Sequence, residues 1–412
     1  MTITLQTAWR KNARILWGGR FLTSMGLTGI SPFIPFYLEN MNAGTTADVL
    51  LWTGLSLSAP AVSYALLTPF WGKLGDRWSR KWMVVRALLG LALSMFLMAV
   101  AQTPFQFFLF RLCQGAFGGI SDASSAFVGT HAPHQEQGVA LGRLERASAL
   151  GLLAGPLLGS LCVSTWGSRP LLFITAGLTG LLGVLAATIL TDKDEKTTAA
   201  ARAAKGTGVL PAFLSLVRQP LVRRFIAAGM LFKLVDFSIF AIFTPFIREL
   251  FHSPASSATI VGLLLAVSSL GELVGAPLWG RRNDRNRLER NLIFAGILCA
   301  LCLAAQTIPL GIVWLLIIRF LQGFFYSALL QTVMLAVLRS SSNSDRGVRV
   351  GATNSLLMIG QISGPTIGLY LGAQLGMSSV FFVMCGVMII ASLLFLQLPV
   401  HARRSKIQLS SE

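Results

Sequence analysis

Long apolar segments alternate with short polar segments along all 412 residues of the chain. A helix that crosses a membrane needs about 20 predominantly apolar residues, and twelve windows of the sequence provide them. The pattern predicts an all-α integral membrane protein with twelve transmembrane helices. The windows cover residues 15–38, 51–71, 83–102, 105–129, 145–166, 170–190, 222–247, 257–279, 291–308, 311–338, 349–373 and 379–399.

One polar segment is longer than the others and lies between the sixth and seventh windows. Residues 191–221 carry charges of both signs, and we interpret them as a cytoplasmic linker between two halves of the chain. The predicted domains are an N-terminal six-helix bundle, this linker, a C-terminal six-helix bundle and a cytoplasmic tail, at residues 1–190, 191–221, 222–400 and 401–412.

The composition favours a membrane protein over the soluble classes. Charged residues make up 12% of the chain and hydrophobic residues 54%, with a mean hydropathy of +0.67, whereas a soluble domain carries about 25% charged residues. A net charge of +18 is also found in nucleic-acid-binding proteins, but these need a basic face in water. Here the basic residues lie in loops between apolar segments, so we expect membrane lipids as partners and no nucleic acid.

Cysteine and histidine give no sign of a disulfide framework or a metal site. The five cysteines lie inside apolar segments, and the four histidines lie in predicted loops without the spacing of metal ligands. The sequence also lacks a glycine-rich nucleotide-binding loop. We therefore expect no metal, no other cofactor and no enzyme activity, with a proton gradient as the energy source.

The basic residues are distributed unevenly between alternate loops. If the N-terminus is cytoplasmic, the loops on the opposite side hold only Arg169 and Arg248 among the 34 Lys and Arg residues. Basic residues are retained on the cytoplasmic side of a membrane. The asymmetry predicts that both termini are cytoplasmic.

The two halves repeat one sequence pattern. Trp71 and Asp76 return 208 positions later as Trp279 and Asp284, each followed by the same residue as in the first copy. Two copies of a six-span unit predict two pseudo-symmetric six-helix bundles. Further matches at nearly the same offset are Pro35-Phe36 with Pro245-Phe246, Arg111 with Arg319, Gln114-Gly115 with Gln322-Gly323, and Gly155-Pro156 with Gly364-Pro365.

The repeat, the six-plus-six arrangement and the two charged loops together resemble the major facilitator superfamily over essentially the whole chain. The first loop matches the superfamily pattern G-x-L-x-D-R-x-G-R-K, except that Ser79 stands where glycine is usual. Residues 151–159 and 360–368 match the G-x-x-x-G-P-x-x-G motif of its twelve-span drug:proton antiporters. The chain resembles bacterial multidrug exporters of the MdtG kind and related siderophore exporters. The resemblance implies the major facilitator fold, a monomer and a place in the bacterial inner membrane.

In that superfamily the charged loop holds the cytoplasmic side closed. The resemblance implies that Asp76 lies beside the N-terminal end of span eleven, where the helix dipole favours a carboxylate. Basic residues of the loop would pair with acids or lipid phosphates. The alternative is an ordinary basic inner loop of a polytopic protein. The candidate latch consists of Gly72, Asp76, Arg77, Arg80, Lys81, Asp284 and Arg285.

The glycine motif predicts close packing of span five against another helix. Gly151, Gly155 and Gly159 lie on one helix face, and small residues let helix backbones approach. Pro156 removes a backbone donor and bends the span. The motif is either a general device for close helix packing or a feature specific to exporters. Its copy in span eleven includes Gly360, Gly364 and Pro365.

Two ionisable residues lie near the middle of span seven, where charge is costly and usually functional. Lys233 and Asp236 are three residues apart and therefore share one helix face. They form either a mutually neutralising pair or a proton or substrate site that faces a cavity. Burial favours the neutral form of Asp236 and Lys233 favours its charged form, so both alternatives stay open.

Span four contains an R-x-x-Q-G pattern that begins at Arg111, and its repeat copy in span ten begins at Arg319, a further candidate for the pathway. Arg111 resembles the span-four arginine of the superfamily, which is associated with proton coupling. Because arginine does not release its own proton, the implied role of Arg111 is to shift the protonation of a carboxylate. Asp122 of span four belongs either to the pathway or to a hydrated region near the loop. The aromatic residues Phe240 and Tyr326 are expected to line the pathway, although aromatic stripes in spans more often face lipid or core.

These features predict a secondary transporter that rocks one half against the other around a midplane site. The expected function is proton-coupled export of a small-molecule substrate, as in drug or metabolite efflux. An alternative is export of an anionic metabolite such as a carboxylate siderophore, favoured because Arg111, Arg319 and Lys233 outnumber the deep acids. A remote alternative is a non-transporting membrane receptor or scaffold, which would be expected to lose its intramembrane charges.

Overall fold

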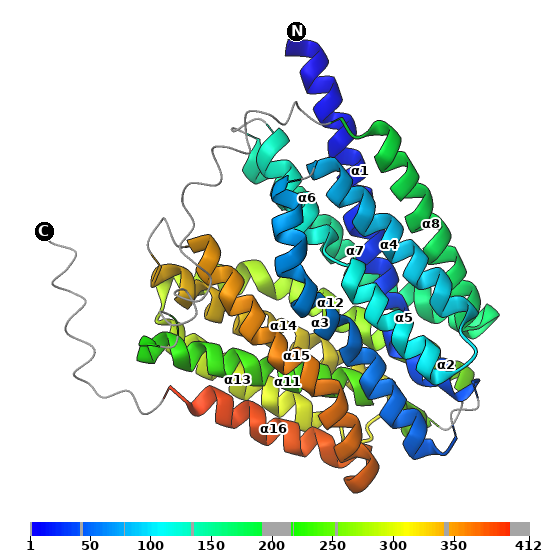
Figure 1. Ribbon diagram of the computed structural model, residues 1–412. Helices are drawn as coiled ribbons and strands as arrows, with labels where there is room; N and C mark the ends of the chain where they lie inside the picture. Colours follow the sequence, from blue (N-terminus) through cyan, green and yellow to red (C-terminus); the bar gives the residue numbers. More distant parts are fainter. Residues whose placement is uncertain are drawn as a thin grey trace, which may run out of the picture.

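Figure 1 shows the computed structural model, which describes residues 2–41, 44–77, 79–132, 136–191, 216, 218–251, 254–341 and 346–395. These residues form helices and no strand. The helices of the N-terminal half are α1 (Thr2–Ile30), η1 (Ser31–Phe33), α2 (Ile34–Glu39), α3 (Thr46–Arg77), α4 (Arg80–Val100), α5 (Pro104–Phe117), α6 (Ile120–His131), α7 (Gln137–Trp166) and α8 (Ser168–Ile189). Those of the C-terminal half are α11 (Pro220–Phe251), α12 (Pro254–Arg285), α13 (Leu288–Ala305), α14 (Ile312–Arg339), α15 (Arg346–Leu375) and α16 (Met377–Leu393).

The predicted all-α membrane fold is confirmed. In the described part of the chain, ten helices are long and apolar enough to cross a membrane, and α16 is a shorter apolar helix. The remaining predicted span, residues 105–129, is divided between α5 and α6. Most of the predicted linker at 191–221 and all of the tail at 401–412 lie outside the described residues.

The fourth predicted span is broken, although its apolar window predicts one continuous helix. Gly119 has a φ of +96°, in the left-handed region that glycine adopts without a steric penalty. Arg86 of α4 donates a 3.1 Å hydrogen bond to the Gly118 carbonyl oxygen, which satisfies a backbone acceptor at the end of α5. The repeat-related helix α14 is continuous through Tyr326 and Ser327, where the second copy has no glycine.

The charged segments that follow spans two and eight are helical, whereas the sequence pattern predicts loops there. Helix α3 continues to Arg77 and α12 continues to Arg285. A helix is held by hydrogen bonds between its own backbone groups, which form in polar and apolar sequence alike. The fall in hydropathy therefore marks where each helix leaves the membrane, and not where the helix ends. Helix α4 begins soon afterwards, at Arg80.

Helix packing is repeated in the two halves, as the sequence repeat predicts. In the first half α1 packs on α7, α3 on α5, and α4 on α8. In the second half the corresponding pairs are α11 with α15, α12 with α14, and α13 with α16. Between the halves, α7 packs on α12 and α3 on α15, so these two pairs form the boundary between the two bundles (Figure 1).

The glycine motifs lie where the backbones of paired helices come close. A Cβ atom at Gly159 of α7 would lie 2.4 Å from the carbonyl oxygen of Gly29 in α1. A Cβ atom at Gly360 of α15 would lie 2.0 Å from the carbonyl oxygen of Met230 in α11. Because no side chain fits at these positions, each glycine face allows its helix to pack closely on the first span of its half.

The repeated tryptophan fixes the end of spans two and eight. Trp71 Nε1 donates a 2.7 Å hydrogen bond to the carbonyl oxygen of Ala116. Trp279 Nε1 donates a 3.0 Å hydrogen bond to the carbonyl oxygen of Phe324. The two tryptophans are 208 positions apart, and so are the two residues whose carbonyl oxygens accept these bonds. The repeated motif therefore makes the same helix contact in each half.

The halves touch at one end of the helices and diverge toward the other. Thr244 Oγ1 donates a 2.6 Å hydrogen bond to the carbonyl oxygen of Pro32, and Ser58 Oγ donates a 2.6 Å hydrogen bond to that of Ile362. These contacts lie away from the end at which α1 begins. In Figure 1 the two groups of helices separate toward that end, so the space between the halves opens there.

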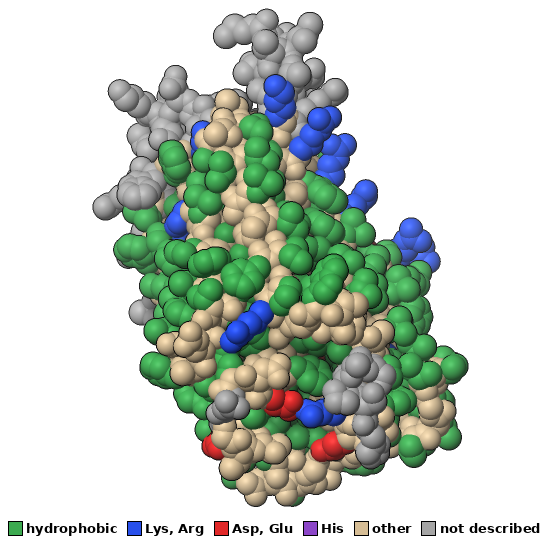
Figure 2. Space-filling model, turned by 90° about the vertical axis from the view of Figure 1, so that its right-hand side faces the viewer, with side chains coloured by type: hydrophobic (Ala, Val, Ile, Leu, Met, Phe, Trp, Pro, Cys, Tyr) green, Lys and Arg blue, Asp and Glu red, His purple; other side chains and the backbone are tan. Residues whose placement is uncertain are grey.

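The outer surface has the side-chain distribution of a protein surrounded by lipid. On the face shown in Figure 2, hydrophobic side chains cover most of the surface. Several Lys and Arg side chains gather toward the top of this view, near the end where α1 begins. An apolar belt with basic residues concentrated at one edge is typical of a protein that spans a membrane.

Candidate functional site

A cavity of about 450 Å³ lies between the two halves. Helices α1, α3, α5 and α7 contribute to its wall from the first half, and α11, α12, α14 and α15 contribute from the second half. Six of the seven predicted pathway residues line it, namely Arg111, Lys233, Asp236, Phe240, Arg319 and Tyr326.

The two arginines of the cavity are each fixed by a glutamine one helical turn further along. Arg319 Nη1 donates a 2.8 Å hydrogen bond to Gln322 Oε1, and Arg111 Nη1 donates to Gln114 Oε1. Arg111 Nε also donates to the Ser56 carbonyl oxygen at 2.9 Å. Because both guanidinium groups are buried, these bonds hold two fixed positive charges at the cavity wall.

Arg319 has a second contact, with an aromatic ring. Its guanidinium carbon lies 3.6 Å from the centroid of the Phe243 ring, which is the geometry of a cation–π interaction. Phe243 is one of several phenylalanines that recur every three residues along α11. Phe240 lines the cavity, whereas Phe243 and Phe246 are buried in the core behind it.

Lys233 and Asp236 project into the same cavity without pairing directly. Among the described side chains of the cavity, no ion pair joins them, and Lys233 Nζ lies 5.2 Å from the centroid of the Phe237 ring. The two charges still interact electrostatically. The lysine is therefore accessible to a ligand that enters the cavity.

Glu272 of α12 also lines the cavity, and sequence reasoning missed it. Its carboxylate interacts electrostatically with Asp236 and with the cations Lys233 and Arg319. The rule that identified Lys233, an ionisable residue deep in an apolar window, also applies to Glu272 in the window 257–279 and could have found it. With Glu272, the cavity contains three cations and two carboxylates.

Two buried polar atoms in the cavity wall have no partner in the described structure. The Tyr326 hydroxyl and Arg319 Nε each lack a hydrogen bond of acceptable geometry among the described residues. The Tyr326 hydroxyl lies near the Asp236 carboxylate and interacts with it electrostatically. A buried donor without a partner is unfavourable by about 1–3 kcal/mol, so Arg319 Nε is suited to bind a polar ligand.

Asp122 lies outside this cavity. It accepts a hydrogen bond from the Tyr64 hydroxyl of α3, close to the break between α5 and α6. Arg20 of α1 forms a 2.8 Å ion pair with Glu145 of α7 and donates a 3.2 Å hydrogen bond to Ser125 of α6. The N-terminal half thus holds a second group of polar contacts, separate from the cavity.

The candidate latch is described only in part. Asp76 and Arg77 belong to the last turn of α3, and their side chains lie outside the described part of the structure. Arg80 begins α4, and Lys81 Nζ lies 5.9 Å from the ring centroid of Trp82. The latch role stays a prediction. In the second copy, Asp284 forms a 3.5 Å ion pair with Arg339 of α14, and Arg285 is exposed.

No metal centre is present in the described residues, since they contain no group of three or more His, Cys, Asp or Glu side chains that could hold a metal ion.

Comparison with known proteins identifies related sequences. The family model described as Major Facilitator Superfamily matches residues 16–258 and 226–411. The staphyloferrin B transporter of Staphylococcus aureus is 37% identical over 391 residues, which are 95% of this chain and 93% of that protein. The multidrug resistance protein MdtG of Proteus mirabilis is 32% identical over 379 residues, covering 91% and 92% of the two chains.

Solved structures share the fold at low sequence identity. A bacterial homolog of the human lysosomal transporter Spinster, in an inward-facing and unoccupied conformation, matches with a TM-score of 0.74 and 13% identity, covering 93% of this chain and 96% of that one. The nucleoside transporter NupG matches with a TM-score of 0.75 and 17% identity, covering 93% and 98%. Both likenesses concern the fold alone.

Proposed function

Because the chain belongs to the major facilitator superfamily, we propose that it is a secondary transporter that exports small organic molecules in exchange for protons. The observation that carries the proposal is the cavity between the halves. It places Arg111 from the first half opposite Lys233, Asp236, Glu272 and Arg319 from the second. A site built from both halves is exposed to alternate sides when they rock.

The contacts between the halves support alternating access. The halves are joined at one end and open at the other, which corresponds to one of the two access states. Access from the closed end would require loss of the Ser58–Ile362 hydrogen bond and of the ion pair between Arg248 and Glu39. That ion pair is partly exposed and so contributes little to stability, about 0–1 kcal/mol. Its loss would therefore oppose the transition only weakly.

The two carboxylates are the proposed proton carriers. Asp236 and Glu272 share the cavity with Lys233 and Arg319. A cationic cargo bound next to a carboxylate favours its ionised form, so the cargo and a proton compete for the same group. Competition between an entering cargo and a proton for these groups would give antiport.

An anionic cargo is the second candidate, and two observations favour it. The cavity contains three cations and two carboxylates, and Lys233 makes no direct ion pair within the described structure. The relative from Staphylococcus aureus is named a staphyloferrin B transporter. Export of a carboxylate siderophore would use Arg111, Arg319 and Lys233 to bind carboxylate groups.

We further propose that the protein is a monomer of the bacterial inner membrane with both termini in the cytoplasm. The basic residues that gather near the start of α1 (Figure 2) support this orientation, because basic residues are retained on the cytoplasmic side. The open end of the cavity would then face the cytoplasm, as an exporter requires for loading. The receptor or scaffold alternative is disfavoured because the cavity retains its charged residues.

Transport in inside-out membrane vesicles tests the function. The vesicles are acidified inside by respiration, and proton release is followed with a fluorescent pH probe after addition of either ethidium or citrate. The proposal predicts cargo-dependent proton release in vesicles that contain the protein, and none in vesicles without it. Release with ethidium supports organic-molecule efflux, and release with citrate supports the anionic cargo. Binding of cargo without proton movement would contradict proton coupling.

A further inference from the structure

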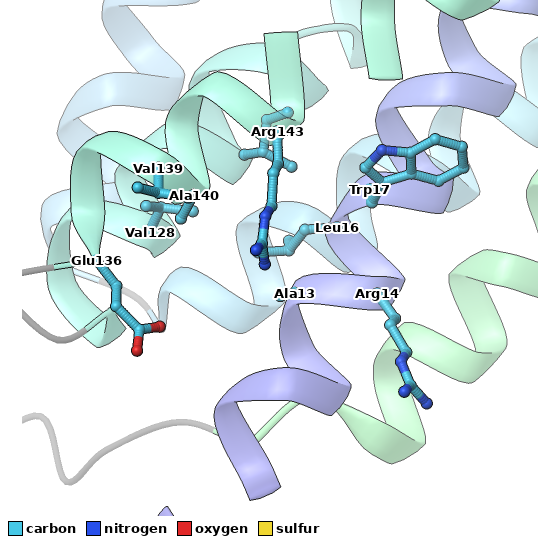
Figure 3. A pocket seen from close by; sticks show the side chains of 10 residues that line it. Ala13, Arg14, Leu16, Trp17, Val128, Glu136, Val139, Ala140 and Arg143 are labelled. Atoms are coloured by element: carbon cyan, nitrogen blue, oxygen red, sulfur yellow. The ribbon is translucent and has the colours of Figure 1, made fainter. Parts of the chain in front are cut away.

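A second cavity, of about 720 Å³, lies in the N-terminal half where α1 and α7 begin. Figure 3 shows it between these two helices. It has no lining residue in common with the central cavity. The transport cycle proposed above does not use it.

The wall of this cavity combines an apolar surface with charged groups. Leu16 and Ala13 come from α1, Val128 from α6, and Ala140 and Leu144 from α7. The charged lining residues are Arg14, Glu136 and Arg143. A cavity with an apolar wall and an excess of positive charge fits a ligand that has an apolar body and an anionic group.

Arg143 is the basic group directed into the cavity. In Figure 3 its guanidinium extends from α7 toward Leu16 of α1, whereas Arg14 extends from the far side of α1. Among the described residues, Arg143 forms no hydrogen bond or ion pair, unlike Arg20, which is paired with Glu145 at 2.8 Å. The five donors of Arg143 are therefore available to a ligand.

The cavity lies at the ends of two membrane spans. The apolar windows of the first and fifth spans begin at residues 15 and 145, so Arg14 and Arg143 lie within about one turn of the start of these windows. Trp17, in the cavity wall, is 37% exposed, and tryptophan is enriched at the level of lipid headgroups. A lipid headgroup and the upper part of its acyl chains are present at this depth.

We propose that this cavity binds a phospholipid with an anionic headgroup, with the phosphate on Arg143 and an acyl chain against Val139 and Ala140, which line the cavity and are accessible. Basic pockets between membrane helices are suited to such headgroups. Arg14 adds positive charge from the far side of α1, and Glu136 repels the phosphate and limits its affinity. A bound lipid would join α1 to α7 at the open end of the bundle.

Lipid binding to the purified full-length protein tests this proposal. Native mass spectrometry in a neutral detergent, with added phosphatidylglycerol or phosphatidylcholine, gives the affinity for each lipid. We expect preferential binding of phosphatidylglycerol. Arg143→Gln should weaken that binding by roughly tenfold or more, because it removes a charge-assisted contact. Arg14→Gln should weaken it by roughly fivefold, as expected for one basic residue near an anionic surface.

Two further variants distinguish binding in this cavity from nonspecific attraction of the anionic lipid to basic residues. Arg146→Gln removes an exposed arginine of the same helix that does not line the cavity, and it should leave binding unchanged. Glu136→Gln removes the repelling charge and should tighten phosphatidylglycerol binding, a gain that a damaged fold would not produce. Equal binding of both lipids, or equal losses in Arg143→Gln and Arg146→Gln, would overturn the proposal. Full displacement of the lipid by millimolar inorganic phosphate would also overturn it, because the site would then bind free anions.

Discussion

Arg319 donates a 2.8 Å hydrogen bond to Gln322, one turn further along α14, and Gln322 Oε1 also accepts a 2.9 Å hydrogen bond from Gln306, the residue that follows α13. The glutamine therefore links the buried guanidinium to a neighbouring helix. The next residue, Gly323, allows α12 to approach, since a Cβ atom there would lie 2.0 Å from the carbonyl oxygen of Ser268. The three residues of the R-x-x-Q-G pattern thus carry the charge, orient it and bring the partner helix close.

We predict that Gln322→Ala impairs transport without preventing membrane insertion. The substitution removes the oxygen that orients Arg319, and a hydrogen bond to a charged group contributes about 1.5–3 kcal/mol. Cargo affinity should fall by roughly tenfold or more, as measured in the inside-out vesicles described above. A variant with wild-type affinity would show that Gln322 only fills space.

Close packing of α15 on α11 predicts a strong position dependence of glycine substitutions. Gly360→Ala places a Cβ atom 2.0 Å from the Met230 carbonyl oxygen, and overpacking typically destabilises by about 1–3 kcal/mol. Gly351 lies in the same helix with open space around it, so Gly351→Ala should be neutral or stabilising by up to about 1 kcal/mol. Thermal unfolding in detergent measures both. Equal melting temperatures would contradict the close backbone contact.

The predicted topology is tested with reporter fusions. An enzyme that is active only in the periplasm should be active when fused after Asn42 or near Ser253, and inactive near Ala199, because the basic loops are retained in the cytoplasm. The opposite activity pattern would reverse the orientation and place the open end of the central cavity on the outer side.

The latch hypothesis predicts that Asp76→Asn leaves the protein inserted but slows its transport cycle. The carboxylate is expected near the N-terminal end of α15 when the cytoplasmic side closes, where a negative charge is stabilised by about 0.3–1 kcal/mol at an exposed site. Expression level and initial transport rate are measured in the same vesicles. Rates equal to the wild type would leave Asp76 as ordinary surface polarity.

The fold could be predicted from the sequence to a large extent, because a lipid environment restricts the choice of structure. Each span satisfies its own backbone in a helix, so length and hydropathy locate the spans, and the 208-residue repeat predicts the pseudo-symmetric pairing. The break at Gly118 and Gly119 could not be predicted, since glycine pairs also occur inside continuous membrane helices. Its position depends on contacts such as that with Arg86.

The candidate site was less predictable for two physical reasons. Helix periodicity places Lys233 and Asp236 on one face, but it does not determine side-chain conformation, and Lys233 lies near Phe237 without pairing with Asp236. The spatial neighbours of a site come from packing between helices. Glu272 was recognised only when α12 placed it in the same cavity, although its depth in an apolar window was a usable signal. Asp122, in the same window as Arg111, is separated from the cavity by the break.

Proton movement in liposomes that contain the purified protein tests the central claim most directly. A pH-sensitive dye inside the liposomes reports protons that cross when a cargo gradient is applied, with ethidium and citrate as the two cargo probes. We predict cargo-dependent proton flux for the wild type and loss of that flux, with cargo binding retained, in Asp236→Asn or in Asp236→Asn/Glu272→Gln. If the cargo is anionic, Lys233→Ala should be more damaging to cargo binding than either carboxylate variant. Wild-type proton flux in Asp236→Asn, Glu272→Gln and the double variant would contradict the assignment of proton coupling to the central cavity.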